Sequence, residues 1–140
     1  MSKYKNKKCN YTFQHKRYDF DSYAERDYFI KLAHKAKAFE VDSLKLQPKY
    51  IIANAYKIDT NKTKSGKSKV GELKYTPDFE HIENGKKVVT EVKGMITKDY
   101  RMRLKMFLAI AHKRYGVDTF IEVIKGIETH YDCTSVKEIA

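Results

Sequence analysis

Two carboxylates and one ammonium group are predicted to meet on neighbouring strands near the middle of the chain. The Asn-Gly pair at 84–85 favours a tight β-hairpin turn. Because residues placed symmetrically about such a turn face each other, Asp78 is expected directly opposite Glu91. Side chains alternate between faces along a strand, so Lys93 shares the face of Glu91 and lies diagonal to Asp78. The two strands of this hairpin are predicted at 73–82 and 87–94.

This cluster indicates a site for a hard divalent cation. Like charges directly opposite on a β-ladder are destabilising, so Asp78 and Glu91 call for a compensating cation, either Lys93 or a bound metal. Mg²⁺ takes oxygen ligands from one or two carboxylates and completes its shell with waters and substrate phosphates. The alternative is a surface charge cluster on a solvated strand face, which is common on sheets.

A third carboxylate, Glu25, is predicted at the start of the first helix. Ser22 and Glu25 have the spacing of a capping box, which opens a helix running to about Phe39. Glu25 lies in line with an apolar stripe directed at the core. The members of that stripe are Tyr28, Phe29, Leu32, Ala33 and Ala36. Glu25 either only closes the capping box or also faces the carboxylate pair, and the two roles are compatible.

Four short blocks in a fixed order carry a resemblance to a known family. The blocks are Phe20-Asp21-Ser22-x-x-Glu25, Gln47-Pro48-Lys49-Tyr50, Tyr75-Thr76-Pro77-Asp78-Phe79 and Glu91-Val92-Lys93-Gly94. Together they resemble the PD-(D/E)XK nuclease superfamily. Within it, the chain is most similar to small phage-encoded endonucleases related to Holliday-junction resolvases and phage endonuclease I. The similarity spans roughly residues 18–125 and implies a restriction-endonuclease-like α/β core with a central mixed sheet flanked by helices.

The resemblance also implies the ligands of a metal site. Asp78 and Glu91 would bind Mg²⁺, for which Mn²⁺ is expected to substitute, with the carbonyl of Val92 as a further ligand. Glu25 would complete the site or hold a second metal. A metal ion lowers the pKa of a bound water and stabilises the oxygens of an in-line phosphoryl displacement.

Two further residues take roles from the same resemblance. Lys93 would orient or help deprotonate the attacking water and would offset charge on the phosphorane. Gln47 matches a Gln-Pro element near the first strand and is placed among the residues that contact DNA.

The overall charge points to a polyanionic partner. The chain has 140 residues, which is enough for one domain, and a formal net charge of +11. Phosphate contacts with counterion release make such a charge typical of nucleic-acid-binding proteins. The alternative is a basic protein whose charge only keeps it in solution.

The basic residues gather in three places. Residues 1–17 are predicted as a mobile basic arm, ahead of a single nuclease domain at 18–140. A flexible, lysine-rich loop is predicted at 60–71, and a third cluster begins the second helix. We interpret these clusters as DNA contacts, against the alternative of solvated surface charge. The predicted contact residues are Lys62, Lys64, Lys67, Lys69, Arg101, Arg103 and Lys105.

The remaining elements complete an α/β pattern. A strand is predicted at 49–58, and a helix capped by Thr97 or Asp99 is expected to end before Gly116. A last strand at 117–124 would lie parallel to 87–94 through a right-handed crossover. The core stripe of the second helix is predicted to consist of Met102, Met106, Ala109 and Ile110.

Sequence motifs typical of several other classes of function are absent from the sequence. Cys9 and Cys133 are isolated, which argues against zinc and suits a reducing cytoplasm. The sequence shows no signal peptide, transmembrane-length stretch, P-loop or dinucleotide fingerprint, so no membrane partner is expected.

The leading hypothesis is therefore a Mg²⁺-dependent DNA endonuclease that acts on branched duplex DNA in phage recombination or replication. A homodimer would suit paired cuts in a four-way junction. Three alternatives stay open. They are a strand-specific endonuclease subunit of the transposon-end type, a non-catalytic nucleic-acid-binding protein with a nuclease-like fold, and an interaction protein.

Overall fold

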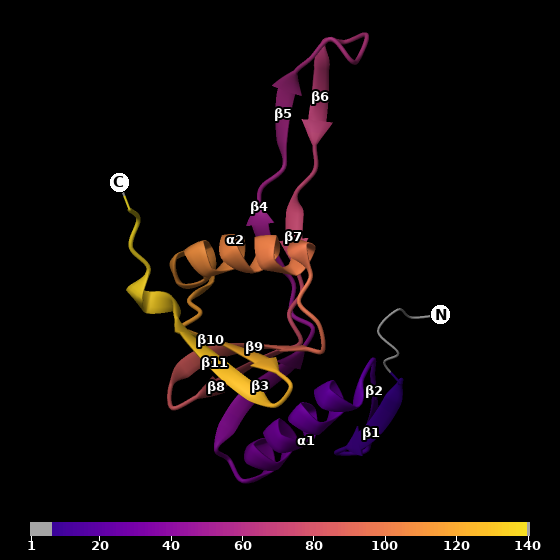
Figure 1. Cartoon of the computed structure of the whole chain (residues 1–140), viewed down its shortest axis with the longest axis vertical. Coiled ribbons are helices and arrows are strands. Elements are labelled where there is room, and N and C mark those ends of the chain that lie inside the picture. Colours follow the sequence, from indigo (N-terminus) through magenta and orange to yellow (C-terminus); the bar gives the residue numbers. More distant parts are fainter. Residues whose placement is uncertain (1–6, 140) are drawn as a thin grey trace.

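A mixed five-stranded sheet forms the centre of this α/β protein (Figure 1). The computed structural model describes residues 7–139. The strand order is β11-β10-β9-β8-β3; β9 and β10 run parallel, and the other neighbouring pairs are antiparallel. The strands are β3 (Val41–Leu46), β8 (Phe79–Glu83), β9 (Lys86–Lys93), β10 (Thr119–Ile124) and β11 (Ile127–Asp132).

Two helices, α1 (Tyr23–Lys37) and α2 (Lys98–Tyr115), cover opposite faces of the sheet. Along β9, Val88 belongs to the hydrophobic cluster under α1, whereas its neighbour Val89 belongs to the cluster under α2. This division follows from the alternation of side chains along a strand. Within residues 7–139, neither helix is long and apolar enough to cross a membrane.

The predicted starts of both helices and the predicted end of the second are confirmed, whereas the first helix ends at Lys37, two residues before the predicted Phe39. The Oγ of Ser22 accepts a hydrogen bond from the N–H of Glu25 at 3.1 Å, and the Oγ1 of Thr97 accepts one from Tyr100 at 3.1 Å. Such caps satisfy N–H groups that have no partner inside the helix. The second helix ends before Gly116, whose φ of 70° lies in the left-handed region that glycine adopts without strain.

The buried face of α2 differs from the predicted one. The residues buried against the sheet are Tyr100, Leu104, Phe107 and Ala111. Met102 from the predicted stripe is 65% exposed, and Ala109 is exposed as well, whereas Met106 and Ile110 are half-buried against the core. Both sets have helical spacing, so periodicity alone does not choose between them. The rings of Tyr100 and Phe107 bury more apolar surface, which decides the face that turns inward.

The β8–β9 hairpin has the predicted register. Glu83 pairs with Lys86 across the turn residues Asn84 and Gly85, whose φ values are 53° and 73°. Positive φ at both positions is the requirement of a type I′ turn. The same register continues to the pair Phe79 and Thr90, one step from the two carboxylates.

The first strand of that hairpin is shorter than predicted. The stretch 73–82 divides into β7 (Leu73–Tyr75) and β8, and β7 pairs with β4 (Tyr50–Ala53) rather than with β9. Pro77 lies at the division, and a proline cannot donate to a continuous ladder. The chain therefore changes sheets immediately before Asp78.

The predicted loop at 60–71 is partly a strand. It contains β6 (Lys67–Val70), which pairs with β5 (Tyr56–Asp59) in a two-stranded ribbon. The predicted strand at 49–58 is likewise divided between β4 and β5. Lysine and serine have little strand propensity, so the pairing of β6 with β5 could not be read from its composition.

The predicted mobile arm at 1–17 contains regular structure in its described part. Strands β1 (Cys9–Phe13) and β2 (Lys16–Phe20) form a hairpin, and residues 1–6 lie outside the described residues. Aromatic side chains on one face of the hairpin surround Phe29 of α1, with ring centroids between 4.8 and 6.2 Å from it. They are Tyr11, Phe13, Tyr18 and Phe20. This aromatic packing, rather than the basic charge, determines the local structure.

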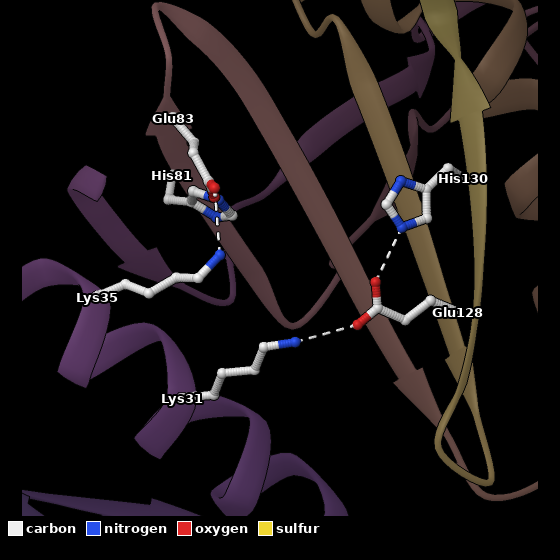
Figure 2. A network of polar contacts seen from close by, with 6 residues as sticks. All are labelled: Lys31, Lys35, His81, Glu83, Glu128 and His130. Carbon is white, nitrogen blue, oxygen red and sulfur yellow. Dashed lines mark hydrogen bonds and ion pairs between the residues drawn. The ribbon is translucent and has the colours of Figure 1, made fainter. Parts of the chain in front are cut away.

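Charged contacts also hold α1 against the sheet (Figure 2). Glu83 in β8 lies 3.2 Å from the Nζ of Lys35 and 3.0 Å from the Nε2 of His81. A second carboxylate is shared between a helix lysine and a strand histidine in the same way, at 3.3 and 2.9 Å. Its residues are Glu128, Lys31 and His130. These contacts help to fix the orientation of the helix that carries Glu25.

Candidate active site

Asp78 is held directly beside Glu91 by the backbone of β9. The N–H of Asp78 donates to the carbonyl of Thr90 at 3.1 Å, and its Oδ2 accepts from the N–H of Val92 at 2.7 Å. The two bonds reach the residues on either side of Glu91. The predicted pairing of the two carboxylates is therefore present.

Glu91 is buried, with 3% of its surface exposed, and its charge has two partners. The hydroxyl of Tyr75 donates to Oε1 at 3.1 Å, and the Nζ of Lys93 lies 3.6 Å from the same oxygen. The Lys93 ammonium also lies 4.9 Å from the ring centroid of Tyr100, within the range of a cation–π contact. Lys93 is thus fixed beside the carboxylate pair, as predicted.

The pKa values of both carboxyl groups are raised. Burial is the main cause for Asp78, followed by the charge of Glu91. Burial is also the main cause for Glu91, and it outweighs the opposing effects of the Asp78 hydrogen bond and the Lys93 charge. The pair is therefore under electrostatic stress when both groups are ionised, and a proton or a cation would relieve that stress.

The carboxylate pair fits a hard divalent cation. Two adjacent carboxylates, with open positions left for waters and phosphate, are the protein contribution that Mg²⁺ accepts. Among residues 7–139, no group of three or more His, Cys, Asp or Glu side chains lies close enough together to hold a metal ion. Asp78 and Glu91 would thus be the acidic ligands, while the carbonyl of Val92 as a ligand stays a prediction.

Glu25 lies near the pair without joining it in a three-carboxylate cluster. Burial raises the pKa of Glu25 to about 7, and the charge of Asp78 adds to the effect, while Lys93 opposes it. The charges of Asp78 and Lys93 thus both act on Glu25. Glu25 is therefore placed to respond to charge at the site, and its role as a metal ligand stays a prediction.

A second buried carboxylate next to Glu91, that of Glu122, was not predicted from the sequence. Glu122 of β10 is paired with Glu91 in the parallel register and is 9% exposed. The hydroxyl of Tyr100 donates to its Oε2 at 2.6 Å. The ring of Tyr100 thus contacts Lys93 while its hydroxyl contacts Glu122. A single acidic residue inside the apolar strand 119–124 was the available signal.

An open cavity of about 300 Å³ gives access to this site. Three cationic side chains lie on its wall, Lys74, Lys93 and Arg103. Arg103 is held in place by Asp99 at 3.0 Å and by the carbonyl of Lys74. The remaining lining residues are Tyr75, Thr76, Glu91, Thr97, Asp99 and Tyr100. The three cations outnumber the two carboxylates of the wall, Glu91 and Asp99, so the wall can receive an anion next to Glu91.

The predicted DNA contacts fall into three groups. Arg103 lines the cavity, whereas Arg101 and Lys105 are exposed on α2 outside it. Gln47 lies beside the site, because its N–H donates to the carbonyl of Asp78 at 2.8 Å. The third group lies in the ribbon of β5 and β6 and the turn between its strands, and this ribbon extends away from β8 and β9 (Figure 1). It comprises Lys62, Lys64, Lys67 and Lys69.

The fold and the site define an α/β protein with a carboxylate pair, one member buried and one half-buried, and an adjacent lysine. The chain belongs to the family described as "Protein of unknown function (DUF1064)", which matches residues 1–131. No curated protein matches the chain, and no solved structure matches it.

Proposed function

We propose that this protein is a Mg²⁺-dependent DNA endonuclease of the PD-(D/E)XK type. The observation that carries the proposal is the pair of a half-buried Asp78 and a buried Glu91, with the Nζ of Lys93 3.6 Å from Glu91. A carboxylate pair of this kind is costly to the fold unless a cation joins it. Its presence beside a cationic cavity supports a role in the chemistry of phosphates.

The side chains divide the work of phosphodiester hydrolysis among them. Asp78 and Glu91 would hold the cation, which supplies Lewis-acid stabilisation of charge on a phosphoryl oxygen. Lys93 places a positive charge, held in position by Glu91 and Tyr100, where charge builds up on the attacked phosphate. Arg103 on the cavity wall would orient the phosphate before attack.

The proposed substrate is branched duplex DNA, cut in phage recombination or replication. The net charge of +11 supports a polyanionic substrate. The preference for a junction rests on the resemblance of the sequence blocks, and so does a homodimer that would cut two symmetric strands. Cys9 and Cys133 are both free thiols, which fits the expected reducing cytoplasm.

A panel of labelled DNA structures tests the activity. Purified protein is incubated with junction, flap, linear duplex and single-stranded DNA, in Mg²⁺ or in EDTA. Cleavage is expected in Mg²⁺ only, fastest on the junction, and absent in Asp78→Asn and Glu91→Gln. Asp42→Asn, an exposed acidic residue of β3, is the matched control and should cleave like the wild type.

Two outcomes would overturn the assignment. One is cleavage at the wild-type rate in either site variant, which would indicate a contaminating nuclease. The other is DNA binding without cleavage under all metal conditions, which would leave the non-catalytic binding protein. Sedimentation with and without the junction tests the dimer, because a monomer that only nicks a cruciform plasmid would argue against junction resolution.

A further inference from the structure

The ribbon of β5 and β6 stands apart from the rest of the protein. It projects beyond α2, away from the central sheet (Figure 1). All four residues of β5 are exposed, and the two strands pack mainly on each other. A lone two-stranded hairpin has little stability of its own in water. Such a ribbon therefore contributes little to the core, and its surface is free to serve a partner.

The two faces of the ribbon differ in chemistry. The register pairs Lys57 with Lys69 and Asp59 with Lys67, and these four side chains share one face. The opposite face carries Tyr56, Ile58, Ser68 and Val70. The ribbon thus has a cationic face and a mainly apolar face.

The cationic face has an electrostatic cost that Asp59, the one carboxylate among its four paired residues, offsets only in part. Lys57 and Lys69 are directly opposite, and like charges in that position destabilise a ladder. Within residues 7–139, neither lysine has a carboxylate within the 4.0 Å of a salt bridge. Two more lysines, Lys62 and Lys64, extend the positive charge into the turn. A bound polyanion would neutralise this face.

The arrangement favours double-stranded over single-stranded nucleic acid. Proteins that bind single strands place aromatic side chains beside their cations so that bases stack on them. Here the ribbon's aromatic residue, Tyr56, lies on the face opposite Lys57 and Lys69. The strands of a ribbon lie about 4.8 Å apart, and a two-stranded ribbon fits the major groove of B-DNA, which is about 12 Å wide.

We propose that the β5–β6 ribbon binds duplex DNA by placing its cationic face in the major groove. Lys57 and Lys69 contact the phosphates that border the groove, and Lys62 and Lys64 in the turn contact further phosphates. This inference deepens the proposed function, since it names the duplex arm as the part of the substrate held by the ribbon. It concerns binding alone, so it can fail or succeed independently of cleavage.

The test measures binding in EDTA, where a metal-dependent nuclease is inactive. Anisotropy of a labelled duplex is recorded at several salt concentrations for the wild type and for Lys57→Gln/Lys69→Gln. Each lost phosphate contact lowers the slope of log affinity against log salt by about 0.9, so the double variant is expected to lose up to about 1.8. Its affinity should fall at least about tenfold at low salt.

Matched variants separate the ribbon from net charge. Lys37→Gln/Lys125→Gln removes the same charge from two exposed lysines outside the ribbon and should bind nearly as the wild type. Lys57→Arg/Lys69→Arg should restore binding, since it keeps both charges. Ile58→Thr on the apolar face should also leave duplex affinity unchanged.

Three results would overturn the inference. The first is wild-type affinity and slope in Lys57→Gln/Lys69→Gln, which would leave these lysines only the role of preventing edge-to-edge pairing of strands. The second is an equal loss in the control pair, which would assign binding to net charge. The third is tighter binding of single-stranded DNA than of duplex by the wild type. If duplex binding depends on the ribbon but no DNA is cut in Mg²⁺, the ribbon inference stands and the endonuclease proposal fails.

Discussion

Replacing Asp78 with asparagine should stabilise the fold while it removes activity. The substitution deletes one of two adjacent like charges, of which Glu91 is buried and Asp78 is half-buried. The Oδ1 of asparagine can still accept the hydrogen bond that Val92 donates at 2.7 Å. Active sites often hold such destabilising groups, so a gain in stability with loss of function is the expected signature. A residue with a purely structural role would show the opposite effect.

The size of the gain follows from the cross-strand position of the two charges. Opposed side chains on a ladder lie about 5 Å apart. Two unit charges at that distance repel by about 3 kcal/mol at an effective dielectric constant of about 20. Lys93 screens part of this repulsion, since its Nζ lies 3.6 Å from Glu91. We therefore expect Asp78→Asn to raise the free energy of unfolding by roughly 1–3 kcal/mol at pH 8.

The increase in the free energy of unfolding caused by Asp78→Asn should grow as pH rises. The pKa values of Asp78 and Glu91 are raised in the folded state, and that of Glu25 is raised to about 7. A carboxyl group whose pKa is higher in the folded than in the unfolded state stabilises the fold when it is protonated. The free energy of unfolding that it contributes is therefore lost as pH rises from about 4, the pKa in the unfolded state, to the pKa in the folded state. The difference between variant and wild type should thus be small at pH 5 and larger at pH 8.

Urea unfolding followed by circular dichroism, in EDTA at pH 5, 7 and 8, measures this difference. Asp42→Asn serves as the exposed control and should track the wild type. Saturating Mg²⁺ should then stabilise the wild type, by about 2.7 kcal/mol at one hundred times its Kd, and the variant much less. A variant that is less stable than the wild type at pH 8 would refute the reasoning about the carboxylate pair.

Three further predictions concern single residues. Lys93→Ala should lower the cleavage rate at saturating DNA about 10²–10³-fold with an unchanged circular dichroism spectrum; an unchanged rate would remove Lys93 from the chemistry. Phe107→Ala empties a position that is 0% exposed and should cost about 3–5 kcal/mol in urea unfolding; a loss below about 1 kcal/mol would contradict the assigned core. Gly116→Ala forces a side chain into a φ of 70° and should cost about 1 kcal/mol, which a neutral effect on the thermal midpoint would exclude.

Local signals were enough to predict the hairpin and the site pair. The Asn84-Gly85 turn determined the register of β8 and β9, and with it the pairing of Asp78 and Glu91. The caps of both helices were equally local, because each depends on a side chain and an N–H three residues apart. Features that depend on neighbouring residues are therefore the ones that the sequence predicted well.

The parallel pairing of β10 with β9 was predicted and is confirmed, but most other features that depend on tertiary packing were not predicted. The edge strands β3 and β11 carry mostly exposed or half-buried side chains, and β3 is interrupted by Ser43 at a φ of 54°. Neither strand shows a clean apolar alternation. The contact between Tyr100 and Glu122 joins a residue on a helix to a residue on a strand. The hydrophobic periodicity of the sequence does not predict a contact of this kind. Which face of α2 is buried depended in the same way on the side chains of the sheet against which the helix packs.

The segment between β3 and β8 leaves the central sheet and returns to it at the same point, which affects how its length can change. Leu46 pairs with Phe79, and the next step is the hydrogen bond from Gln47 to the carbonyl of Asp78. Everything at 48–77 leaves the sheet and returns to the same point. Doubling the length of such a closed segment costs only about 0.6 kcal/mol in chain entropy. The ribbon can thus tolerate insertions and deletions while Asp78 stays in register with Glu91.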